Sequence, residues 1–152
     1  RYASRGLGDV YKRQHLFQCF YSENSLVAMR AMNGVKRIIK DDKNVFLKNK
    51  DRFLNQFSNS KHNVVKLGLI TIYFDFLNHF EEKEVSKIKT IVLNWTKNSS
   101  DWMILAQGMK LLEKLSKSDK SLKLKLIEVA KRLKNDERKV VRTKAQNILK
   151  DN

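Results

Sequence analysis

The sequence has no proline, only five glycines and one cysteine among its 152 residues. The scarcity of proline and glycine argues against a turn-rich β-sandwich and against a Pro/Gly linker between domains. Cys19 by itself excludes an intramolecular disulfide and a Cys-rich zinc site. No apolar run approaches the ~18 residues that a spanning helix needs, so we expect no membrane partner. Because no signal-peptide pattern is visible either, we expect a reducing intracellular compartment, the cytoplasm.

Motifs that carry catalysis or cofactor binding are also missing. The sequence contains no GxGxxG, no Gly-rich loop ending in GK[ST], no GxSxG and no HExxH. Its histidines, His15, His62 and His79, lie in different segments without metal-ligand spacing. We interpret His62 as a solvated turn residue, His79 as a helix-end residue and Cys19 as a small core residue. We therefore predict no enzymatic activity, no metal, no cofactor and no small-molecule substrate.

The first fourteen residues lack the pattern that follows them. Residues 9–14, DVYKRQ, resemble the translation of a transposon end used in preparing sequencing libraries. On that interpretation residues 1–14 are a non-native leader, and the fold begins near residue 15. The alternative is a genuine basic N-terminal arm.

An internal repeat organises the remainder. Four segments align on an aliphatic anchor at spacings of 37, 40 and 37 residues: Val27, Val64, Ile104 and Val141. Four residues later stands a small residue: Ala31, Gly68, Gly108 and Ala145. Eight residues after the anchor stands Val35, Ile72, Leu112 or Leu149, and five residues before it a residue of helix N-cap type, Ser22, Asn59, Ser99 or Asp136. These offsets trace one face of a helix, on which the small residue allows a neighbouring helix to approach closely.

A second helix precedes each of these, with short polar breaks between the two. The pattern predicts an all-α chain of antiparallel helix pairs: 43–57 with 61–79, 83–96 with 100–116, and 119–134 with 137–150. An incomplete earlier pair is expected at 15–21 with 23–39. A two-helix unit every 37–40 residues is close to the ~40–47-residue period of HEAT and armadillo arrays.

The last unit resembles a HEAT repeat most specifically. Asp136, Val141, Arg142, Ala145 and Leu149 match the family's Asp, Val-Arg pair, small residue and Leu. The other units depart from it, since Ser22, Asn59 and Ser99 replace the Asp, and Ala28, Val65 and Leu105 replace the Arg. The resemblance implies an armadillo-like α-solenoid of about four repeats, the first incomplete, forming a single domain over residues 15–152. An irregular helical bundle is the alternative.

The charge is strongly positive and uneven. Lys and Arg number 32 against 16 Asp and Glu, a formal net charge of +16, and residues 97–152 hold 15 of the basic residues against 7 acidic ones. In HEAT-like arrays the second helices line the concave surface, which nominates seven candidate partner- or phosphate-binding residues: Arg30, Arg37, Lys66, Lys110, Lys114, Arg142 and Lys144. We predict a non-enzymatic scaffold that binds an acidic protein through this surface.

Two alternatives to that prediction stay open. One is nucleic-acid binding by the same basic groove, because Lys and Arg neutralise phosphates and release counterions. The other is a merely solvated face, since 23 of the 32 basic residues are the strongly hydrated Lys.

One acidic residue stands among aromatics, in the segment Tyr73-Phe74-Asp75-Phe76, with Trp95 and Trp102 in the next unit. A carboxylate desolvated by aromatic rings is a candidate general acid or base. The arrangement resembles, loosely, the DNA alkylation-repair glycosylases, which are built from HEAT-like repeats. The resemblance implies a repair context for the nucleic-acid alternative, and a glycosylase-like activity centred on Asp75 as the exception to the non-enzymatic prediction. The competing interpretation places Asp75 in solvent while the aromatic residues pack.

Overall fold

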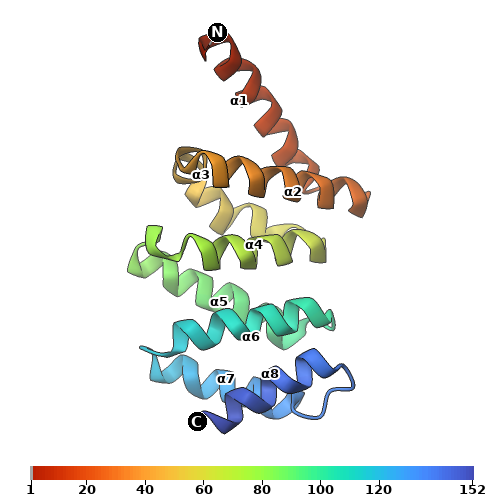
Figure 1. Ribbon diagram of the computed structural model, residues 1–152, viewed down its shortest axis with the longest axis vertical. Coiled ribbons are helices and arrows are strands. Elements are labelled where there is room, and N and C mark those ends of the chain that lie inside the picture. The colour runs from red at the N-terminus through yellow and green to blue at the C-terminus, as the bar shows by residue number, and fades with distance from the viewer. Residues whose placement is uncertain (1) are drawn as a thin grey trace. The chain divides into compact units, whose positions relative to one another are not determined.

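The chain is all-α, as predicted. The computed structural model describes the backbone of residues 2–152 and the side chains of residues 8 and 10–152, and every regular element within them is a helix (Figure 1). In chain order these are α1 (Tyr2–Cys19), α2 (Ser25–Asp41), α3 (Lys43–Asn55), the 3₁₀ turn η1 (Phe57–Asn59), α4 (Asn63–Asp75), the 3₁₀ turn η2 (Leu77–His79), α5 (Glu82–Asn98), α6 (Trp102–Ser116), α7 (Lys120–Leu133) and α8 (Lys139–Lys150).

The chain divides into two compact units, Arg1–Leu69 and Ile70–Asn152, with the division inside α4. In the first unit α1 packs on α2, and α2 on α3. In the second unit each of α5, α6 and α7 packs on the helix that follows it, and α6 also packs on α8. Paired neighbouring helices are therefore the building block of both units.

The helix boundaries follow the predicted pairs, with two differences. α4 ends at Asp75 rather than near residue 79, because the chain tightens into η2, where the amide of Phe80 bonds the carbonyl of Leu77. α1 begins at Tyr2 and runs continuously to Cys19, well before the predicted start at residue 15. Residues 2–14, which we interpret as a leader, are thus helical in continuity with the residues that follow.

Aromatic residues form the core of the first unit. The rings of Phe17, Phe20, Phe53 and Phe57 are buried, and the Phe17 and Phe57 centroids lie 4.8 Å apart. The Arg52 guanidinium carbon lies 4.9 Å from the Phe17 ring centroid and 5.1 Å from that of Phe57. This arrangement is typical of a cation–π contact, which lets a charged side chain cover an aromatic core.

The small residues of the repeat lie on the packed faces of their helices, as predicted. Ala31, Gly68, Gly108 and Ala145 are all buried. A Cβ placed on Gly68 would overlap the Met32 side chain, and one placed on Gly108 would overlap Cγ2 of Thr96. Neighbouring helices therefore approach these two glycines more closely than any other residue would allow.

The predicted anchors are correct in the second unit and wrong by one residue in the first. Ile104 and Val141 are fully buried, whereas Val27 is 37 % exposed and Val64 half-buried. Ala28 and Val65 take the buried positions instead. Each residue turns a helix by about 100°, so a shift of one residue moves a side chain from the core to its rim. For the same reason Leu149 is half-buried and its neighbour Ile148 buried.

The predicted N-caps also need correction. The side-chain oxygens of Ser22 and Ser99 accept from the amides of Asn24 and Asp101, and it is these later residues that cap α2 and α6. Asp136 likewise accepts from the amide of Arg138, the residue before α8.

The corresponding residue before α4 is Ser60 rather than Asn59. Its hydroxyl oxygen accepts from the amide of His62, while Asn59 closes η1. Every second helix thus follows the same local turn, in which a Ser or Asp side chain bonds the amide two residues later. The residues nominated as caps of α2, α6 and α8 therefore open this turn, two positions before the residue that precedes each helix. Before α4 the nominated residue, Asn59, stands one position before the turn.

Candidate functional site

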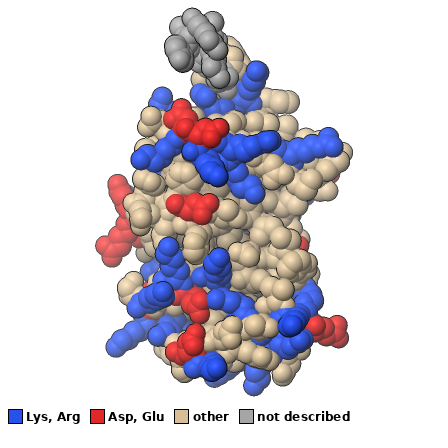
Figure 2. All heavy atoms as spheres, viewed as in Figure 1, with Lys and Arg blue, Asp and Glu red and all other residues tan. Residues whose placement is uncertain are grey.

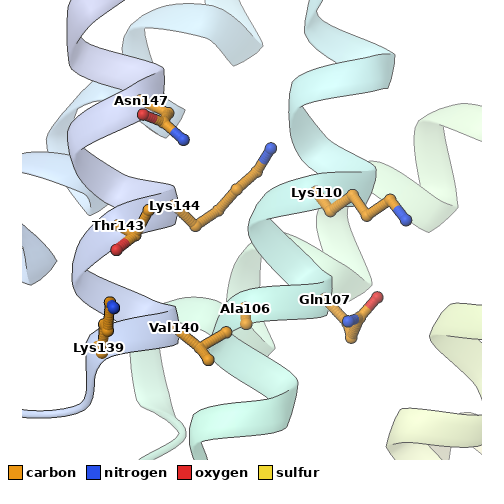
Figure 3. Close-up of a pocket in the computed structure, with 8 residues that line it drawn as sticks. All are labelled: Ala106, Gln107, Lys110, Lys139, Val140, Thr143, Lys144 and Asn147. Atoms are coloured by element: carbon orange, nitrogen blue, oxygen red, sulfur yellow. The ribbon is translucent and has the colours of Figure 1, made fainter.

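A groove lies between the exposed sides of α6 and α8 in the second unit. It encloses about 400 Å³. Figure 3 shows the residues that line it: Ala106, Gln107 and Lys110 from α6, and Lys139, Val140, Thr143, Lys144 and Asn147 from α8. They recur at intervals of three and four residues, so each helix presents one stripe to the groove.

The helices hold these stripes in place by burying their opposite faces. α6 begins at Asp101, whose carboxylate accepts from the amides of Met103 and Ile104. Along α8 the buried residues Val141, Ala145 and Ile148 each stand one residue after a groove-lining residue. The packing of α8 therefore fixes which side chains face the groove.

One end of the groove is apolar. Ala106 and Val140 lie opposite each other there (Figure 3), and Val140 is 53 % exposed. One turn earlier on α6, Trp102 and Met103 are 45 % and 39 % exposed. A monomeric surface scatters single apolar residues, so large exposed side chains that gather beside a groove indicate a contact site.

Three lysines also line the groove, and the Lys110 side chain extends away from α8 (Figure 3). Lys139 and Lys110 are exposed, and Lys144 extends from α8 toward α6 (Figure 3). The Lys144 ammonium donates to Oε1 of Glu113 on α6 at 2.6 Å, and the two side chains are 25 % and 30 % exposed. One of the three lysines that line the groove is thus already paired with a carboxylate, and that carboxylate does not itself line the groove.

The C-terminal half of α6 carries a second basic feature. The ammonium nitrogens of Lys110 and Lys114 lie 5.2 Å and 4.5 Å from the centroid of the half-buried Phe74 ring. Each distance is within the range of a cation–π contact. These two lysines are accordingly held on one aromatic side chain of α4.

Arg142 does not line this groove, and its predicted role in binding a partner stays a prediction. Its guanidinium donates to the main-chain carbonyls of Asp136 and Glu137 in the loop before α8. Beside it the Arg138 guanidinium donates to both carboxylate oxygens of Asp136. The hydrogen bonds from Arg138 lower the pKa of Asp136 to about 2. The two hydrogen bonds from Arg142 therefore stabilise the loop before α8.

The remaining candidate residues belong to the first unit. Arg30 and Arg37 are exposed on α2, and Lys66 is half-buried near the start of α4. Of the seven candidates, Lys110 and Lys144 line one groove, and Lys114 shares the Phe74 ring with Lys110. The single basic groove shared by all seven stays a prediction.

The charge of the second unit is dispersed. Its sequence holds 18 Lys and Arg against 11 Asp and Glu. On the face shown in Figure 2, the basic side chains over α6 to α8 alternate with uncharged surface and with carboxylates. Such a pattern differs from the continuous stripe expected of a protein that follows a phosphate backbone.

Asp75 is exposed at the end of α4, with Phe74 and Phe76 half-buried on either side. This agrees with the interpretation that the aromatic residues pack while the acid faces water. Trp95 is buried, as expected of a packing residue, but Trp102 is 45 % exposed, contrary to that expectation.

The structure corrects two further expectations. His62 is buried rather than solvated, because its Nε2 lies within hydrogen-bond distance of the Ser22 carbonyl in the preceding turn. Cys19 is half-buried rather than in the core, with its Sγ 3.8 Å from Nε2 of the exposed His15. The contact of Cys19 with His15 fits their spacing of four residues on one helix, whereas the contact of His62 joins residues forty positions apart.

Within the described residues, no three His, Cys, Asp or Glu side chains gather in a way that could hold a metal ion. No helix of residues 2–152 combines the length and the apolar character that a membrane span requires.

Sequence reasoning missed most residues of the groove: Ala106, Gln107, Lys139, Val140, Thr143 and Asn147. A usable indication was the pair Val140-Val141, in which two aliphatic residues are adjacent on a helix with one buried stripe. If Val141 faces the core, Val140 must face elsewhere.

The sequence matches no family model, no curated protein and no solved structure.

Proposed function

We propose that the chain is a non-enzymatic interaction module that binds a segment of another protein. The observation that carries this proposal is the groove between α6 and α8, where the exposed Val140 stands among Lys110, Lys139 and Lys144. An exposed aliphatic side chain loses unfavourable hydration when a partner covers it. Charged groups around it favour partners of opposite sign.

We further propose that the helix pairs form a HEAT-like α-solenoid. The repeat of 37–40 residues, the packing of consecutive helices within each unit and the common turn before every second helix support this arrangement. Helical repeats of this kind bury their apolar faces against their neighbours and offer extended surfaces to partners. A protein segment is a natural ligand for such a surface.

The alternative proposal is nucleic-acid binding, including a DNA-repair context, and the net charge of +16 favours it. Two observations support the protein segment more strongly. A phosphate backbone has no aliphatic group to cover Val140. Phosphate recognition also favours the bidentate Arg, which is absent from the groove.

The test is a selection of displayed random peptides on the full chain at physiological salt, with Val140→Ser as the counter-selection. We expect peptides that bind the unaltered chain and are lost on the variant. Leu124→Ser on α7 is the matched control, because Leu124 is 67 % exposed and does not line the groove.

Failure to enrich any peptide, together with submicromolar binding of a labelled DNA duplex, would contradict the protein-binding proposal and favour the nucleic-acid alternative. Peptides that bind the Leu124→Ser chain normally and the Val140→Ser chain weakly would support it.

A further inference from the structure

We propose that the α6–α8 groove takes a short acidic segment with one aliphatic side chain two residues away from a carboxylate. The aliphatic group covers Ala106 and Val140, and the carboxylate lies at Lys144. This inference rests on the proposed function and specifies the chemistry of its partner. A nucleic acid and an uncharged apolar segment are the alternative occupants. The binding experiments distinguish them from the acidic segment.

The charge of the groove argues for an acidic occupant. Lys110, Lys139 and Lys144 line it, and Glu113 is the carboxylate bound to one of them. The groove therefore holds an excess of positive charge that a partner carboxylate can balance. A lysine partly shielded from water binds a carboxylate more strongly than a fully exposed one, and Lys144 is three-quarters buried.

The position of the apolar end determines the spacing. Val140 and Lys144 are separated by one turn of α8, a rise of ~6 Å along the helix. An extended segment advances ~3.3 Å per residue, so two residues span that distance. Side chains of an extended chain also return to the same face every second residue, which brings both groups to the groove.

Glu113 already competes for Lys144 within the protein, although it does not itself line the groove. Its carboxylate accepts from the Lys144 ammonium at 2.6 Å, and this is the group that a partner carboxylate must displace or share. Removal of the negative charge of Glu113 should consequently strengthen binding of an acidic segment. A purely structural ion pair would give no such gain.

The experiment measures fluorescence anisotropy of a short labelled peptide with one leucine and, two residues later, a pair of glutamates. It is titrated with the full chain at low and at physiological salt. Two companion peptides carry glutamines in place of the glutamates, or serine in place of the leucine. We expect each companion to bind about five-fold more weakly or worse.

Variants of the chain locate the site. Val140→Ser and Lys144→Gln should each weaken binding of the acidic peptide about five-fold, whereas Glu113→Gln should strengthen it about three-fold. Lys139→Gln provides a second test of the charge at an exposed position. Leu124→Ser and Lys125→Gln on α7 are the matched controls, and far-UV circular dichroism verifies the fold of every variant.

Equal binding of the glutamate and glutamine peptides, or Glu113→Gln without a gain, would overturn the acidic occupant. If selected peptides still bind the groove through Val140, the protein-binding proposal stands while this inference fails. If the labelled DNA duplex binds more tightly than every peptide, and if its affinity depends on Lys144, the protein-binding proposal and the acidic occupant both fail.

Discussion

Gly108 is a residue at which two helices of the second unit approach closely. A Cβ there would overlap Cγ2 of Thr96, whose hydroxyl donates to the carbonyl of Leu93. Thr96 is fully buried, so its methyl group has no open space into which to move. The absence of a side chain at residue 108 thus determines the distance between α5 and α6.

We expect Gly108→Ala to destabilise the chain by about 1–3 kcal/mol, because an added methyl group in a packed core forces its neighbours apart. The measurement is the free energy of unfolding in urea. Adding Thr96→Ser removes the overlapping methyl group and keeps the hydroxyl, so the double variant should regain the loss. If the double variant stays as unstable as Gly108→Ala, the contact with Thr96 is not the cause.

Asp136 shows how a loop residue contributes to stability against acid. Its pKa is about 2 in the folded chain, below the ordinary value of 3.8, mainly because the Arg138 side chain bonds the carboxylate. A carboxylate whose folded pKa is lowered stabilises the fold above the unfolded pKa. That stabilisation is lost as the pH falls from about 3.8 to about 2.

Arg138→Gln should therefore raise the pKa of Asp136 and move the midpoint of acid unfolding to higher pH. Acid titration followed by far-UV circular dichroism measures that midpoint. In an Asp136→Asn background the same Arg138→Gln change should have no further effect on the midpoint. A shift of equal size in that background would show that Arg138 acts through another group.

At the scale of the element, the second helices share a start made of two parts. A Ser or Asp side chain first bonds the amide two residues later, and the helix follows from there. Before α6 the two parts are Ser99 and the N-cap Asp101, whose carboxylate accepts from two amides of the first turn. Those amides have no partner within the helix, so the cap satisfies them.

Asp101→Ala should lower the free energy of unfolding by ~1 kcal/mol, the usual effect of losing an N-cap. Ser99→Ala should have a smaller effect, since it leaves the two amides of the first turn bonded. Urea unfolding of the two variants compares the residue that caps α6 with the one that the sequence pattern nominated. A larger effect of Ser99→Ala would contradict the structural assignment.

For the whole molecule the main question is what the net charge of +16 does. In the second unit several charged side chains already have partners within the protein: Lys89 with Asp119, Arg138 with Asp136, and Lys144 with Glu113. Lys110 and Lys114 lie over Phe74. Formal charge therefore overstates the number of cations that a phosphate backbone would meet.

We expect a labelled DNA duplex to bind the full chain weakly at low salt and to be released near physiological salt. A protein that neutralises many phosphates shows a steep dependence of log K on log salt and still binds tightly at physiological salt. Anisotropy titrations over a salt series distinguish the two. Charge reversal of Lys110, Lys114 and Lys144 that leaves duplex affinity unchanged would exclude this surface as a phosphate site.

Much of the fold could be predicted from local sequence. The helix pairs and the buried small residues Ala31, Gly68, Gly108 and Ala145 follow from apolar spacing, which a helix converts directly into faces. The buried register of α2 and α4 could not be predicted, because Val27-Ala28 and Val64-Val65 each offer two adjacent apolar residues. Contacts with neighbouring helices decided between them.

The candidate site was harder to predict than the fold. Lys110 and Lys144 were nominated from charge and helix position, and both line the groove. Arg142 was nominated for the same reasons, yet it bonds the loop carbonyls of Asp136 and Glu137. Net charge and periodicity do not specify which hydrogen-bond acceptors a long side chain will find, since those acceptors come from other parts of the chain.

By itself, the sequence determined that this protein is all-α and where the helices after α1 begin and end to within a few residues. It did so because turns, caps and apolar periodicity act over a few neighbouring residues. The tertiary structure alone decided that Val140 is exposed beside Ala106, that Lys144 meets Glu113, and that His62 is buried against the Ser22 carbonyl. Each of these contacts joins residues more than thirty positions apart, and packing between helices sets them.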